Sequence, residues 1–98
     1  MDAPTFEWDA AKATANVTKH GVSFEEAATA FQDALARIHA DPDNSASERR
    51  EILVGHSTHG RLLLVAFTER RGRLRLISAR EVTRRERRDY EESQQDSS

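Results

Sequence analysis

The residues best suited to chemistry in this sequence are the arginines of its last third. Residues 61–90 contain ten arginines and four acidic residues, a local balance of +6 in a chain whose net charge is −2. Four of these arginines lie between Arg84 and Arg88. The planar guanidinium group donates paired hydrogen bonds to two oxygens, so such a concentration favours anionic partners. The near-neutral whole chain argues against a general nucleic-acid coat protein, and the pattern indicates a local patch that binds phosphate.

Arg80 is the arginine that we expect to hold a phosphoryl group. It follows the predicted strand 73–79, where alternation places Leu74, Leu76, Ser78 and Arg80 on one face unless a β-bulge intervenes. A charged group at the end of an apolar face must reach a rim, a cleft or a carboxylate partner. The alternative, a solvated Arg80 at a frayed strand end, is equally compatible with the pattern.

The helix that follows begins with a clear signal. Thr83 and Glu86 have the spacing of a capping box, in which the threonine oxygen accepts from the N–H of Glu86 and the carboxylate reaches back. This predicts a helix from Arg84 to about Glu92 and assigns Glu86 chiefly to structure. Tyr90 either packs its ring or presents its hydroxyl to a phosphate, and packing is the favoured interpretation.

The arginines of this helix are the predicted RNA-binding residues. Residues three and four apart share one helix surface, which groups Arg84, Arg87 and Arg88. Like charges so close together are mildly destabilising, and an anionic partner would relieve the repulsion. The alternative is an ordinary charged surface paired with neighbouring acids.

A second place for chemistry is the end of the first predicted helix, where Lys19 and His20 precede Gly21. Cations at this position suit the negative end of the helix dipole, which is a sufficient structural account. A histidine beside a lysine is also how a general base or a phosphate contact would be displayed. The other histidines show no metal-ligand spacing and the chain has no cysteine, so we expect neither a metal nor a cofactor.

The elements that must position these residues follow from capping signals and apolar periodicity. Asp9 and Gly21 delimit a helix at 10–20, with Ala13 and Val17 as its best inward residues. Ser23 and Glu26 form a second capping box before a helix that ends near Asp33. The predicted strands are 5–8, 35–40, 51–56, 61–68 and 73–79, with a turn at 41–44 and a loop continuing to Arg50.

This order predicts an α+β fold with a short N-terminal strand, two helices, an antiparallel meander of three or four strands and a C-terminal helix. We expect one domain over residues 1–98, ordered from about 5 to 92, with a disordered tail at 93–98. No apolar run is long enough to span a membrane and no secretory signal is visible, so we expect a cytoplasmic location and no membrane partner.

Several blocks of the sequence resemble the BrnT family of bacterial toxins, which belong to type II toxin–antitoxin pairs. The resemblance extends in order from Phe6 to Glu92. The matching blocks are Phe6-Glu7-Trp8-Asp9, Lys19-His20-Gly21-Val22-Ser23-Phe24, Ile77-Ser78-Ala79-Arg80, Arg85-Glu86-Arg87 and Tyr90-Glu91. The resemblance implies a RelE-like fold and a ribonuclease that inhibits translation. It also implies a BrnA-like antitoxin partner, through which alone the toxin would meet operator DNA.

The implied reaction is metal-independent cleavage of RNA, in which the ribose 2′-hydroxyl attacks the adjacent phosphate. A base must take the hydroxyl proton, and cations must hold the charge that builds on the phosphoryl oxygens. We predict Arg80 as the phosphoryl clamp, with Arg61 and Lys19 as second choices for this charge. His20 or Glu86 is the predicted proton-transfer group.

The absence of an unambiguous base leaves a second hypothesis open. In this alternative the protein is a non-enzymatic basic module that docks onto an acidic protein or a nucleic acid. A third possibility, compatible with the ribonuclease, is that the antitoxin covers the basic surface with acidic side chains in place of phosphate.

Overall fold

The computed structural model describes residues 4–41 and 49–95. Residues 42–44 of the predicted turn, most of the loop that follows it, and residues 96–98 of the predicted tail lie outside the described residues. No helix in the described part of the chain is long and apolar enough to cross a membrane.

The elements follow the predicted order. They are β1 (Phe6–Glu7), α1 (Ala10–His20), α2 (Phe24–Thr29), the 3-10 turn η1 (Ala30–Gln32), β2 (Arg37–Ala40), β3 (Glu51–His56), β4 (Leu62–Arg70), β5 (Arg73–Glu81) and α3 (Arg84–Gln95). The α+β class is confirmed. The helix α3 extends beyond its expected end at Glu92, so the first part of the predicted disordered tail is helical.

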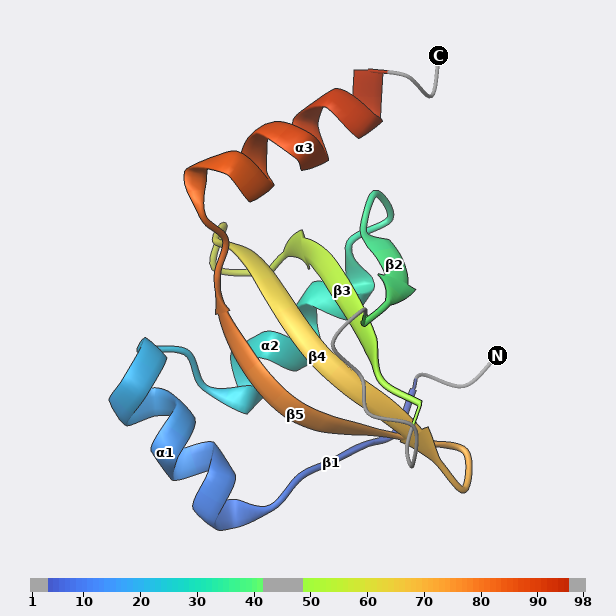
Figure 1. Cartoon of the computed structure of the whole chain (residues 1–98). Coiled ribbons are helices and arrows are strands. Elements are labelled where there is room, and N and C mark those ends of the chain that lie inside the picture. Colours follow the sequence, from blue (N-terminus) through green and yellow to red (C-terminus); the bar gives the residue numbers. More distant parts are fainter. Residues whose placement is uncertain (1–3, 42–48, 96–98) are drawn as a thin grey trace.

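The strands form one sheet in the order β1-β5-β4-β3-β2 (Figure 1). The strands β2 to β5 make the predicted antiparallel meander. The strand β1 adds a fifth member that pairs with β5 in parallel, so the sheet is mixed and not purely antiparallel.

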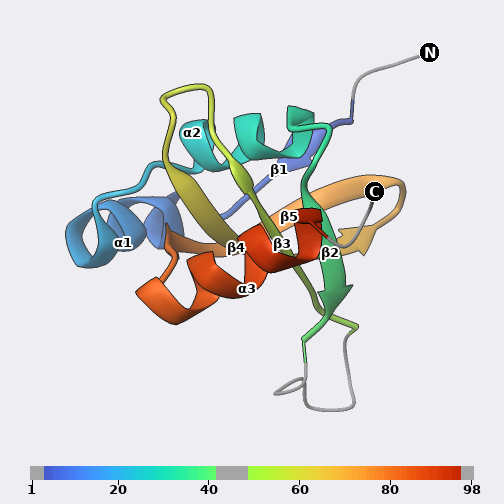
Figure 2. The same cartoon turned by 90° about the horizontal axis from the view of Figure 1, so that it is seen from above.

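Helices cover the sheet on both faces. Figure 2 shows α2 on one side of the strands and α3 on the other. The larger core lies under α1 and α2; its fully buried members include Phe24, Leu53, Leu63, Val65 and Leu76. The smaller core lies under α3, where Tyr90 packs on Val54 and Leu62. The face under α3 is the one that carries most of the candidate site.

The first helix begins and ends as predicted but turns a different residue inward. The Asp9 carboxylate accepts from the N–H of Lys12, and Gly21 ends α1 in the left-handed conformation at φ 70°. Ala13 packs against the larger core as predicted, but the prediction that Val17 faces inward is wrong, because Val17 is exposed and Asn16 is buried.

Asn16 is buried because it completes the edge of β5. The pairing of β1 with β5 ends at Glu7 opposite Arg75, so the rest of that edge has no described strand beside it. The Asn16 side chain donates to the carbonyl of Ala79 at 2.8 Å and accepts from its N–H at 3.1 Å, as a neighbouring strand would. It also donates to the Val22 carbonyl at 2.8 Å, which joins α1, β5 and the start of α2.

A β-bulge in β5 changes the direction of Arg80. Phe67 lies opposite Leu76 and Ala66 lies opposite Ser78, which leaves Ile77 as an extra residue. Beyond the bulge, Ala79 returns to the larger core, and Arg80 lies opposite Leu64 on the face under α3. The prediction that Arg80 shares the face of Leu74 and Leu76 is therefore wrong, because the extra residue interrupts the alternation.

Candidate active site

Arg80 is held by a carboxylate of α3. Its guanidinium group donates to both oxygens of Glu86, at 2.8 and 2.9 Å, and also to the carbonyl of Glu81 at 3.2 Å. This paired geometry is the one that an arginine uses for phosphate. Arg80 therefore has the carboxylate partner that one hypothesis required, and its guanidinium group lies at the start of α3.

Glu86 performs two structural tasks at once. Its carboxylate accepts from the N–H of Thr83 at 2.8 Å, while the Thr83 hydroxyl accepts from the N–H of Glu86 at 3.1 Å, so the predicted capping box is present. The hydrogen bonds from Arg80, assisted by those of Thr83, outweigh burial and lower the pKa of Glu86 to about 2. A carboxylate with this pKa is ionised at neutral pH and is a weak base, so it suits holding Arg80 better than moving protons.

Arg61 belongs to a separate cluster, which it forms with Glu26, Glu81 and Gly21. Its Nε donates to Glu26 at 2.9 Å, and its terminal nitrogens bond Glu81 at 3.2 Å and the carbonyl of Gly21 at 3.1 Å. The Glu26 side chain is only 5% exposed and also accepts from the Ser57 hydroxyl at 2.8 Å. These contacts make Arg61 a connection between the end of α1, the start of α2 and the sheet.

This cluster explains why the second capping box is only half formed. The Ser23 hydroxyl accepts from the N–H of Glu26 at 3.0 Å, as predicted. The Glu26 carboxylate, however, is directed to Arg61 and Ser57. The hydrogen bond from Arg61 is the largest influence on its pKa, which falls to about 2 despite burial.

The structure brings the five candidate catalytic residues to one end of the sheet, but in two groups. Lys19 and His20 end α1 beside Gly21, whose carbonyl binds Arg61. Arg80 and Glu86 form the other group, under α3. Glu81, the neighbour of Arg80 in β5, bonds Arg61 and so joins the two groups through the strand.

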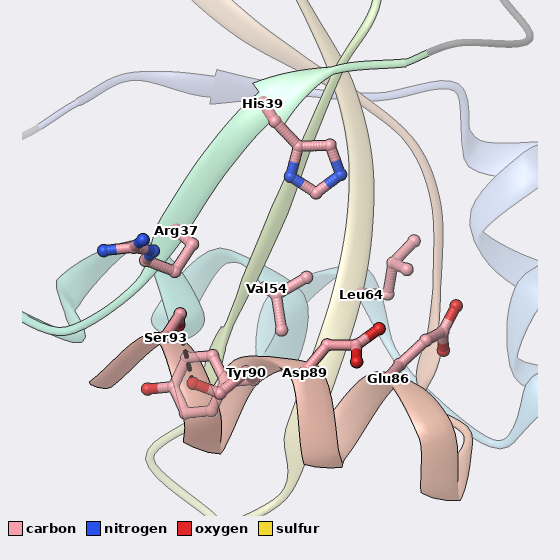
Figure 3. Close-up of a pocket in the computed structure, with 8 residues that line it drawn as sticks. All are labelled: Arg37, His39, Val54, Leu64, Glu86, Asp89, Tyr90 and Ser93. Atoms are coloured by element: carbon pink, nitrogen blue, oxygen red, sulfur yellow. Dashed lines mark hydrogen bonds between the residues drawn. The ribbon is translucent and has the colours of Figure 1, made fainter. Parts of the chain in front are cut away.

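A pocket of about 290 Å³ opens on the face that carries Arg80, between β2 and α3 (Figure 3). Its lining residues come from β2, the central strands and α3; they are Arg37, His39, Val54, Leu64, Glu86, Asp89, Tyr90 and Ser93. Figure 3 shows the His39 ring directed from β2 into the space above Val54 and Leu64, with the carboxylates of α3 on the far side.

Cross-strand pairing explains the arrangement of this pocket. Arg37 lies opposite Val54, Val54 opposite Leu64, and Leu64 opposite Arg80. Cross-strand partners share a face of the sheet, so these residues form one row across four strands. The row has an arginine at each end and an apolar floor between them, which suits a chain of phosphates separated by ribose and base.

Tyr90 and Asp33 fasten α3 beside the pocket. Tyr90 is buried, as the favoured interpretation predicted, and its ring lies edge-on to that of His56 at 5.6 Å. Its hydroxyl is 3.4 Å from the Asp33 carboxylate, which also accepts from the N–H of His56 at 2.8 Å. Burial, with the nearby Asp33 charge, raises the pKa of Tyr90, so its hydroxyl stays protonated.

The arginines predicted to bind RNA are exposed. Arg84, Arg87 and Arg88 lie on the outer surface of α3, and Arg84 and Arg88 line one shallow hollow there with Arg85, Asp89 and Glu92. They are therefore available to an anionic partner close to Arg80.

Sequence reasoning missed Arg37, His39 and Asp89. Arg37 and His39 belong to a short strand and carry no motif, and only their spacing of two along a predicted strand indicates a common face. Their relation to α3 depends on strand pairing, which the sequence does not display. Among the described residues, no group of three or more His, Cys, Asp or Glu side chains could hold a metal ion.

Comparison with known proteins assigns the class first. Residues 8–86 match the model of a family described as "Ribonuclease toxin, BrnT, of type II toxin-antitoxin system". The protein is therefore a toxin of the type II toxin–antitoxin class, and this class implies an antitoxin partner. Within it, the chain belongs to the BrnT family, as the sequence resemblance predicted.

A solved structure supports the fold. The chain is similar to the ribonuclease toxin BrnT of Brucella abortus, solved at 1.1 Å, with a TM-score of 0.65 and 23% identity. The match covers 84% of this chain and 100% of that one. No curated protein matches the sequence.

Proposed function

We propose that this protein is an endoribonuclease toxin that cleaves RNA on the sheet face under α3, without a metal ion, and that a BrnA-like antitoxin neutralises it. The observation that carries the proposal is the row from Arg37 through Val54 and Leu64 to Arg80, in a member of a ribonuclease toxin family. Two arginines can contact successive phosphates while the apolar floor receives a base or a ribose.

In the proposed reaction, the 2′-hydroxyl of the substrate attacks the adjacent phosphorus and the 5′-oxygen leaves. His39 takes the hydroxyl proton, because it is the histidine that lines the pocket. Arg80 holds the charge that builds on the phosphoryl oxygens, Arg37 binds the neighbouring phosphate, and a water at the open side protonates the leaving oxygen.

The remaining candidates have supporting roles in this proposal. Glu86 orients Arg80 and is a positioning residue. Arg61 joins the elements at the end of the sheet, and Lys19 adds positive charge to that end. His20 lines no described part of the pocket, which makes it a matched control for His39.

The first test uses purified protein and a synthetic RNA in buffer that contains EDTA. We expect products with 2′,3′-cyclic phosphate and 5′-hydroxyl ends, because these follow from attack by the 2′-hydroxyl. Replacing His39 by Gln should lower kcat by about 100-fold or more, whereas His20→Gln should change it by less than about threefold.

Arg80 has a control on its own strand. Arg80→Ala should lower cleavage by about 100-fold or more. Arg75→Ala also removes an ion-paired arginine from β5, since Arg75 bonds Glu7 at 3.2 Å. Arg75 precedes the bulge and does not line the pocket, so this variant should leave cleavage within about twofold. RNA that is bound but never cut would instead favour the non-enzymatic binding module.

A further inference from the structure

The strand β2 is the last of its sheet, and no described residue pairs with its outer edge. All four of its residues, Arg37 to Ala40, are exposed. An open strand edge is a ready template for pairing with another chain.

The register identifies the outward backbone groups. The N–H of Asp41 donates to the carbonyl of Arg50 at 3.1 Å, next to the pairing of Ala40 with Glu51. In an antiparallel pair, hydrogen-bonded and non-hydrogen-bonded positions alternate. Arg37 and His39 therefore use their peptide groups on β3, while Ile38 and Ala40 direct their N–H and C=O groups away from the sheet.

The side chains of β2 differ between its two faces. Arg37 and His39 line the pocket under α3. Ile38 points to the opposite face and is 54% exposed, and Leu35, just before the strand, is 59% exposed. These are two of the three large apolar side chains that are exposed in the described part of the chain. The edge thus offers an arginine and an imidazole on one face and an apolar group on the other.

We propose that an extended segment of the antitoxin adds to the edge of β2, with acidic side chains facing Arg37 and His39 and apolar side chains facing Ile38. The inference rests on the proposed function, since it names the partner of that site. Alternating side chains on an added strand match the two faces of β2. The added strand runs along the rim of the pocket and places carboxylates where we propose that RNA phosphates bind.

Charge favours this occupant over a second copy of the chain. Antiparallel pairing of two β2 edges about an axis perpendicular to the sheet keeps equivalent faces on the same side. It would therefore place two copies of Arg37 on one face, where like charges oppose association. An acidic segment neutralises the same groups.

The test measures backbone hydrogen exchange by NMR, with acetyl-Glu-Val-Glu-Val-Glu-Val-amide as the probe at millimolar concentration. The amides of Ile38 and Ala40 should exchange rapidly in the free protein and slow by roughly tenfold with the peptide. The amides of Arg37 and His39 should change little, because β3 already protects them. A peptide with Lys in place of Glu should give no slowing.

The control variant is Ile38→Pro, which removes an outward N–H and places a ring on the edge while the hydrogen bonds to β3 remain. It should abolish the response, and unchanged spectra for β4 and β5 would show that the fold persists. Equal slowing by both peptides, no slowing at all, or slow exchange at Ile38 in a peptide-free dimer would overturn the inference. These outcomes are separate from RNA cleavage, so a protein that cleaves RNA but ignores the acidic peptide retains the proposed function and loses only this inference.

Discussion

Two carboxylates of this protein, Glu26 and Glu86, are each held by an arginine, but they differ in burial and therefore in consequence. The Glu26 side chain is almost inaccessible to water and has Arg61 and Ser57 as partners. Glu86 lies at a helix start and is partly exposed. Hydrogen bonds to a carboxylate that is shielded from water cost more to lose than a partly solvated contact, because water cannot replace them.

Glu26→Gln should lower the free energy of unfolding by about 2 kcal/mol, because Arg61 and Ser57 lose a charged acceptor that is almost inaccessible to water. Denaturant unfolding followed by circular dichroism measures this value. The matched control is Glu81→Gln, which removes the exposed partner of the same arginine and should cost less than about 1 kcal/mol. Equal losses for the two variants would show that burial does not distinguish them.

The lowered pKa of Glu26 also makes the free energy of unfolding depend on pH. Its pKa is about 2 in the folded protein against 4.5 ordinarily, so the unfolded state binds protons first as pH falls. The stabilisation is complete above about pH 4.5 and is lost as pH falls towards 2. Glu86 contributes in the same window. The parent should therefore lose more stability between pH 5 and pH 3 than Glu26→Gln does, and parallel curves would contradict this.

Among the elements, those delimited by local signals could be predicted and those that depend on distant partners could not. Asp9, Gly21 and the pair Thr83–Glu86 act within a few residues, so α1 and the start of α3 fall where the sequence indicates. The parallel pairing of β1 and the bulge at Ile77 depend on contacts made across the sheet. The same limit applies to the proposed site, since the sequence singles out Arg80 but does not indicate its face of the sheet, and His39 carries no local signal.

Asn16 shows the energetic importance of one such distant contact. Asn16→Ala should lower the free energy of unfolding by about 3 kcal/mol, since the buried peptide groups of Ala79 and Val22 lose their partner. The amide of Ala79 should also exchange faster, which NMR detects. Val17→Ala, an exposed substitution on the same helix, should change stability by less than about 0.5 kcal/mol. A small loss for Asn16→Ala with slow exchange at Ala79 would show that the side chain is not the substitute for a strand.

At the scale of the whole molecule, positive charge gathers at both ends of β5. Arg84, Arg87 and Arg88 lie on α3 beside the proposed site, whereas Arg70, Arg71 and Arg73 lie at the turn between β4 and β5, at the far end of the sheet (Figure 1). The two groups carry the same formal charge. Comparing variants of the two groups therefore distinguishes the effect of local phosphate contacts on RNA binding from the effect of net charge.

Replacing the three arginines of α3 by Gln should raise KM for RNA by about tenfold or more with little change in kcat, because in the proposed function they bind RNA without touching the reacting atoms. The dependence of KM on salt concentration should also become less steep. The same replacement of the three arginines at the turn should alter KM by less than about twofold. A similar rise in KM for both variants would mean that RNA binding follows net charge and not the surface beside Arg80.

The bulge at Ile77 makes the face on which Arg80 lies independent of the number of residues that precede it in β5. The face of Arg80 is determined where Asn16 holds Ala79 and Leu64 lies opposite Arg80, so an extra residue before that point is absorbed locally. In evolutionary terms, the strand can gain or lose a residue here without exchanging the two faces of the residues beyond it. The same event in an unbulged strand would invert every side chain beyond it. Insertions and deletions among relatives should therefore be tolerated at this position. A sequence alignment without a gap there would match Arg80 with a residue that lies on the opposite face of the strand in the relative.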